Sequence, residues 1–121
     1  MHFDEIAGRI GAMLPEELDR LPFGIIQLDD TGRILHYNDY ESRLAGVPRD
    51  SAVGKNFFTE VAPCTDVKDF AGRFREGVAA RKLDVRFRYR FDFKPRPRDV
   101  LVTLHYTDAT ASVWVIVQPL D

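Results

Sequence analysis

The sequence contains one cysteine, Cys64, which follows Pro63 and a largely apolar stretch at residues 57–62. A thiol acts as a nucleophile at neutral pH through even a small thiolate fraction, and it needs no metal to do so. A lone cysteine is nevertheless more often a structural residue that behaves as a small hydrophobic side chain. The cysteine itself therefore leaves two interpretations open, a reactive attachment point and a core position.

A cysteine hydrolase or transferase would need a base beside the thiol. His36 and His105 are the candidates by residue type, but both fall in predicted strands and no motif connects either of them to Cys64. The spacing of the three histidines and the cysteine matches no metal-binding signature. The sequence thus gives little support to an enzyme or to a metal centre.

Tyr37 and Glu41 are four residues apart, directly around a predicted helix start at Asn38. On a helical turn, side chains at this spacing can point the same way. The alternative is a capping box, in which Glu41 bonds the backbone of the first turn and faces water. Spacing alone favours the capping box.

The composition is that of an ordinary soluble globular protein. The chain has 121 residues, 45% hydrophobic and 30% charged, with a net charge of −2. This length fits one domain, and the charge balance predicts neither a nucleic-acid nor a membrane partner. We expect no transmembrane segment and no signal peptide, and a single cysteine is compatible with a reducing cytoplasm.

Hydrophobic periodicity predicts an α+β fold. Apolar residues recur at helical spacing from residue 2 to about 21, and Pro15 marks a second helix start within this stretch. We interpret residues 1–22 as an N-terminal helical cap and residues 23–121 as the core domain. A longer helix is predicted over residues 67–81, and strands are predicted over residues 23–29, 33–37, 85–93, 100–106 and 112–118. This order suits a five-stranded antiparallel sheet with helices mainly on one face.

The strand at residues 85–93 alternates aromatic and charged side chains without a break, so its aromatic face is expected to be buried. Tyr89 and Phe91 on that face would then wall a cavity together with the residues flanking Cys64. A cysteine beside an aromatic cavity can anchor a planar ligand.

Three stretches carry a family resemblance: residues 54–58 with 61–66 around the cysteine, residues 34–38 with Glu41, and residues 87–92. On these motifs the chain resembles the photoactive yellow proteins, which are small blue-light receptors with the PAS fold. The resemblance implies p-coumaric acid (4-hydroxycinnamate) held as a thioester on Cys64. It also implies that Tyr37 and a protonated Glu41 donate hydrogen bonds to the phenolate. The remaining chromophore-binding residues would be Ile26, Val61, Ala62, Thr65, Phe91 and Phe93.

The resemblance further implies a photocycle. The chromophore isomerises from trans to cis, Glu41 gives its proton to the phenolate, and the cap unfolds or undocks to form the signalling state. An unidentified downstream signalling protein would respond, with the photoreceptor a monomer or weak homodimer. Ala45, Val47 and Pro95 depart from the residues usual in the family, and we expect slow dark recovery as a result. The alternative is a PAS interaction or small-ligand module that carries no chromophore.

Overall fold

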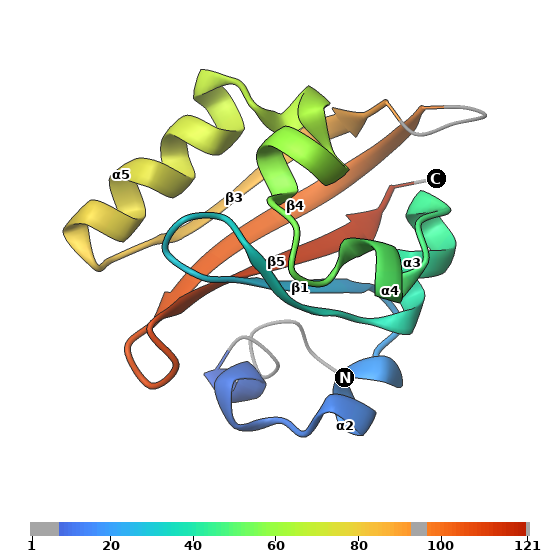
Figure 1. Ribbon diagram of the computed structural model, residues 1–121. Coiled ribbons are helices and arrows are strands. Elements are labelled where there is room, and N and C mark those ends of the chain that lie inside the picture. The colour runs from blue at the N-terminus through green and yellow to red at the C-terminus, as the bar shows by residue number, and fades with distance from the viewer. Residues whose placement is uncertain (1–7, 93–96, 121) are drawn as a thin grey trace.

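The computed structural model describes residues 8–92 and 97–120, and it confirms the predicted α+β class (Figure 1). Five strands form one antiparallel sheet in the order β2-β1-β5-β4-β3. Phe93, a predicted chromophore-binding residue, and Pro95, expected to affect dark recovery, lie outside the described residues. The helices are η1 (Ile10–Ala12), α2 (Pro15–Asp19), α3 (Asp39–Ala45), α4 (Arg49–Ala52), η2 (Phe57–Val61), η3 (Pro63–Thr65), η4 (Lys68–Gly72) and α5 (Arg73–Ala80), and the strands are β1 (Gly24–Leu28), β2 (Ile34–Tyr37), β3 (Asp84–Phe91), β4 (Arg98–Thr107) and β5 (Ser112–Pro119).

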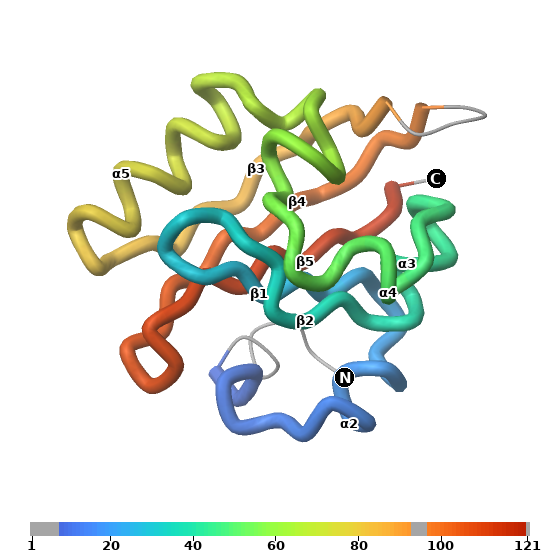
Figure 2. Tube along the Cα trace, in the orientation of Figure 1, coloured from blue at the N-terminus to red at the C-terminus, as the bar shows by residue number. Residues whose placement is uncertain are grey.

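The helices from α3 to α5 cover one face of the sheet, as Figures 1 and 2 show. The predicted helix at residues 67–81 is present as η4 followed directly by α5, and it ends where Arg81 takes a left-handed conformation with φ of 54°. Phe70 on this helix packs edge-on against three aromatic side chains of β3, with ring centroids 5.4 Å (Phe87), 5.2 Å (Tyr89) and 6.0 Å (Phe91) away. This aromatic contact joins the helical layer to the edge of the sheet.

The expectation that the whole aromatic face of β3 is buried was only partly right. Phe91 is buried, but Phe87 and Tyr89 are half-buried. The reason is that β3 is an edge strand, so the helical layer covers it incompletely.

The N-terminal segment lies on the opposite face of the sheet (Figures 1 and 2). Ile10, Leu18 and Leu21 are buried there against Trp114 and Ile116 of β5. We refer to described residues 8–22 as the cap. The second helix start predicted at Pro15 is confirmed by α2, and η1 and α2 are short and are separated by extended residues. Leu14 precedes Pro15 and has an extended ψ of 154°, because a residue before proline is excluded from helical geometry.

No helix within the described ranges 8–92 and 97–120 has the length and apolar character needed to cross a bilayer.

Candidate functional site

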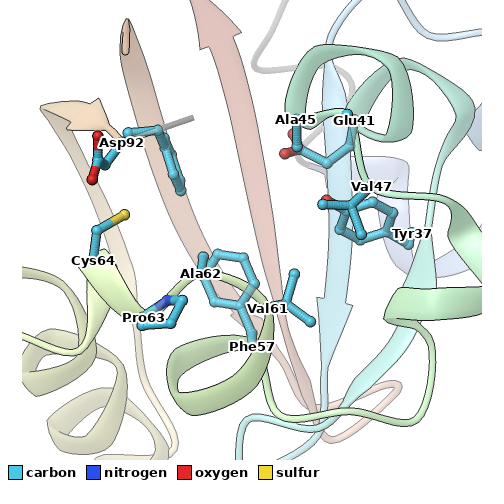
Figure 3. Close-up of a pocket in the computed structure, with 12 residues that line it drawn as sticks. Tyr37, Glu41, Ala45, Val47, Phe57, Val61, Ala62, Pro63, Cys64 and Asp92 are labelled. Carbon is cyan, nitrogen blue, oxygen red and sulfur yellow. The ribbon is translucent and has the colours of Figure 1, made fainter. Parts of the chain in front are cut away.

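A cavity of about 430 Å³ lies between the sheet and the short helices. This volume is in the range of small-molecule sites. In Figure 3, Cys64 and Asp92 lie on one side of the cavity, and Tyr37, Glu41, Ala45 and Val47 lie on the other. Its lining comprises Tyr37, Glu41, Ala45, Gly46, Val47, Phe57, Val61, Ala62, Pro63, Cys64, Phe91 and Asp92. The structure therefore brings the lone cysteine and the Tyr37–Glu41 pair to opposite ends of one cavity.

The capping-box interpretation of Glu41 was wrong. The first half of the motif is present, since Asn38 Oδ1 accepts a hydrogen bond from the Glu41 amide at 3.0 Å. The Glu41 side chain, however, turns into the protein and is 1% exposed. The reason is that β2 ends at Tyr37 and α3 packs against β1, which puts the fourth residue of the turn over the cavity rather than over solvent.

The Glu41 carboxyl group is a neutral acid at neutral pH. Burial raises its pKa to about 8, because the charged form loses its hydration. Within the described chain, Glu41 Oε1 is fully buried and has no hydrogen-bond partner. Burial, and secondarily the Glu41 carboxylate, raise the pKa of Tyr37, which therefore stays a phenol. The pair thus offers two O–H donors at one end of the cavity.

Short local hydrogen bonds fix the position of Cys64. Asn56 caps η2 by accepting from the amides of Phe58 (2.9 Å) and Thr59 (3.1 Å). Pro63 then starts η3, where Thr65 Oγ1 donates to the Ala62 carbonyl at 2.7 Å. The hydroxyl of Tyr89 on β3 donates to the Cys64 carbonyl. These contacts tie the cysteine turn to both η2 and the sheet.

The two histidines considered as bases lie on the other face of the sheet. His36 pairs in register with Gln27, and His105 pairs with Trp114, which itself pairs with Gln27. Side chains that are paired in this way point to the same face of the sheet. This is the face that the cap covers, because Trp114 belongs to the cluster of buried cap residues. The geometry therefore does not support a cysteine–histidine pair. Across the described residues, no three His, Cys, Asp or Glu side chains gather as metal ligands would.

The expectation that Tyr89 walls the cavity was wrong, because its hydroxyl bonds to the Cys64 carbonyl and its side chain is not part of the lining. Most of the predicted chromophore-binding residues do line the cavity, with three exceptions. Ile26 is fully buried in the core between β2 and β5, and Thr65 is fully buried with its hydroxyl bonded to Ala62. Neither side chain reaches the cavity surface. Phe93 lies outside the described residues. Pro63 lines the cavity as predicted for a residue flanking Cys64. Gly46, Phe57 and Asp92 line it without having been predicted, and the place of Phe57 in the cysteine motif was the available signal.

The fold and this site define a PAS-fold sensor domain. The PAS fold family matches residues 12–120 of the chain. Photoactive yellow protein from Rhodothalassium salexigens is 44% identical over 95% of this chain and 92% of its own length. The protein of that name from Halochromatium salexigens is 41% identical over 99% of this chain and 98% of its own.

Among solved structures, the photoactive yellow protein domain of the sensor histidine kinase Ppr from Rhodospirillum centenum is similar, with a TM-score of 0.88 and 43% identity. The match covers 93% of this chain and 99% of that one. The chain belongs to the photoactive yellow protein family, and it is a photoreceptor with a PAS fold. This confirms the resemblance seen in the sequence, and membership implies a chromophore.

Proposed function

We propose that the chain is a blue-light receptor in which Cys64 holds p-coumaric acid as a thioester and Glu41 is the proton donor. The observation that carries this proposal is the position of the buried Glu41 carboxyl, which lies beside the Tyr37 phenol across the cavity from Cys64. A thioester at one end and two O–H donors at the other match the two ends of a p-coumaroyl group. The buried Glu41 Oε1, unpartnered by any described residue, also fits a site completed by a ligand.

The bound p-coumaroyl group would supply absorption of blue light and the trans-to-cis isomerisation. Residues of the protein hold the proton in the dark and transfer it after light. In the dark, Tyr37 and Glu41 donate hydrogen bonds that make a buried phenolate tolerable. After light, Glu41 releases its proton to the phenolate and becomes a carboxylate in a dry site. An unpaired buried charge of this kind costs several kcal/mol, comparable to the whole stability of a small domain.

The cap is positioned to respond to that charge. Asn38 is fully buried, and its Nδ2 donates to the Leu18 carbonyl of the cap at 2.8 Å. Its Oδ1 accepts from the amides of Ile25 at 2.9 Å and Glu41 at 3.0 Å. A movement of the Glu41 turn therefore strains a bond to the cap directly. We infer that the cap undocks to form the signalling state, because short elements with few buried side chains open first.

Slow dark recovery remains part of the proposal. Ala45 and Val47 line the donor end of the cavity, and their side chains supply neither a hydrogen-bond donor nor a positive charge. When the dark state re-forms, a phenolate at that end would receive no hydrogen bond and no favourable charge interaction from positions 45 and 47. The third departure, Pro95, lies outside the described residues.

The output is proposed to be a change of surface that a downstream signalling protein reads. Support comes from the similar domain in a sensor histidine kinase. A monomer or weak homodimer remains the predicted state.

Reconstitution tests the proposal. Purified apoprotein is mixed with an activated p-coumaric ester, and the product is denatured and analysed by absorption and mass spectrometry. We expect a yellow adduct on Cys64 that survives denaturation and bleaches under blue light when folded. A chromophore-free module would stay colourless, and a hydrolase would turn the ester over without retaining it. Cys64→Ser is the control, and an adduct of the same stability in this variant would refute thioester attachment.

A further inference from the structure

Gly24, the first residue of β1, lies directly against the carboxyl group of Glu41. A β-carbon at Gly24 would lie 2.0 Å from Glu41 Oε1, 3.1 Å from its Cδ and 3.2 Å from its Cβ. The first distance is far inside van der Waals contact, so no other amino acid fits at position 24 while Glu41 keeps this position. The carboxyl group therefore occupies the space that a side chain at position 24 would fill.

The backbone gives no other reason for a glycine here. Gly32, Gly46 and Gly54 have left-handed φ angles of 92°, 71° and 90°, whereas Gly24 does not have a positive φ. Gly24 pairs regularly with Val117 of β5 in the sheet. A glycine within a strand costs about 0.5–1 kcal/mol relative to alanine and often marks a close approach of another group. The group that approaches Gly24 is the Glu41 carboxyl.

The position also determines the surroundings of that carboxyl. Oε1 is seated against the β1 backbone, where no described residue offers it a hydrogen bond. The turn that carries Glu41 is fixed next to this seat, because Asn38 Oδ1 accepts from both the Ile25 amide and the Glu41 amide. A carboxyl held in such a seat is tolerated only as a neutral acid.

We propose that Gly24 is a positioning residue for the proton donor: its missing side chain gives the Glu41 carboxyl a dry seat against β1, and this seat keeps the acid protonated. The proposal deepens the proposed function, because it names the residue that makes Glu41 a proton donor. It concerns the titration of Glu41 in the protein without chromophore, so it can be tested separately from the photochemistry.

The test is Gly24→Ala, with the titration of Glu41 followed in the apoprotein by the infrared band of its protonated carboxyl. Glu41→Gln identifies that band. An added methyl group must displace the carboxyl toward the cavity and water, so we expect the midpoint to fall by about one pH unit or more.

Gly77→Ala is the matched control. A β-carbon at Gly77 would also clash, at 2.6 Å from Leu83 Cβ, but Gly77 is in α5, away from the Glu41 seat. This variant is expected to lose stability and to leave the Glu41 midpoint unchanged. A folded Gly24→Ala protein whose Glu41 midpoint stays within about 0.3 pH unit of wild type, well below that shift, would overturn the proposal.

A double variant decides the case in which Gly24→Ala fails to fold. In G24A/E41G all three Glu41 atoms that the new β-carbon would meet are removed, so folding should return to the level of E41G alone. If G24A/E41G is also unfolded while E41G folds, the glycine serves the backbone and the proposal is wrong.

Discussion

Removing the guanidinium of Arg49, a residue that does not line the cavity, should loosen the cap. Arg49 Nη2 bonds to Asp19 Oδ1 of α2 at 2.6 Å and also to Asp39 at the start of α3. Its Nε donates to the Tyr37 carbonyl at 2.9 Å. One side chain thus joins the cap to the strand end and helix start that carry Tyr37 and Glu41.

The size of the effect follows from the exposure of these groups. The side chains of Arg49 and Asp19 are 36% and 22% exposed, so solvent screens the ion pair in part. Exposed ion pairs contribute about 0.2–1 kcal/mol, and hydrogen bonds to charged groups about 1.5–3 kcal/mol. We expect Arg49→Met to weaken cap docking by about 1–2 kcal/mol, which is roughly a 5- to 30-fold change in the docking equilibrium.

Hydrogen exchange in the dark measures this change directly. The Leu18 amide bonds to the Leu14 carbonyl at 3.0 Å and reports on the cap, whereas amides of β5 report on the core. The protection of Leu18 should fall in Arg49→Met and also fall in wild type at high salt, with β5 much less affected. Arg43→Met is the control, since the Arg43 guanidinium lies 6.0 Å from the centre of the Tyr40 ring and makes no hydrogen bond or ion pair with a described residue of the cap. Equal Leu18 protection in wild type and Arg49→Met would refute this account of cap docking.

Three further predictions concern the site. In the apoprotein, the folded pKa of Glu41 (about 8) lies above its ordinary value of 4.5, so the folded state binds the extra proton and stability should fall as pH rises between these values. The stability should fall by at most about 1.4 kcal/mol per pH unit. Denaturant titration of wild type and Glu41→Gln at several pH values isolates the contribution of Glu41. His36, whose pKa is lowered chiefly by burial, contributes with the opposite sign, and this contribution cancels because both proteins contain it. Identical pH profiles would contradict the neutral acid. Tyr89→Phe removes the bond to the Cys64 carbonyl and should cost about 1 kcal/mol of unfolding free energy, whereas no loss would show that this bond does not fix the cysteine turn. After a blue flash, the reconstituted protein should take longer than about a second to return to its dark absorption, since Ala45 and Val47 add neither a donor nor a positive charge to the Tyr37 and Glu41 donors, and a buried anion with less support is costly to re-form. Faster recovery would count against the role given to Ala45 and Val47.

The sheet was predictable because its signals are local. The alternation along β3 and the turns between strands are properties of neighbouring residues, and these strands lie within a few residues of the predicted limits. The cap was predicted less well. Ile10 becomes buried, but Leu14 on the same predicted apolar face is 59% exposed, because the chain leaves helical geometry before Pro15 and apolar spacing does not show where it does so.

The site depended on information that spacing does not contain. The pattern Asn38 to Glu41 equally fits a solvent-facing capping box, and only the packing of α3 on β1 decides where the Glu41 carboxyl goes. The family resemblance named the Tyr37–Glu41 pair, which lies across the cavity from Cys64, whereas residue types alone left several candidates open. The contact between Gly24 and the Glu41 carboxyl was not predicted, because a glycine in a strand indicates that some group approaches closely but does not identify that group.

The central claim is that light takes a proton from the buried Glu41 carboxyl. A light-minus-dark infrared difference spectrum of the reconstituted protein measures this proton directly. The account predicts the loss of a protonated-carboxyl band on illumination, its return with dark recovery, and its absence in Glu41→Gln. A protein that bleaches in blue light while this band remains unchanged would contradict the claim.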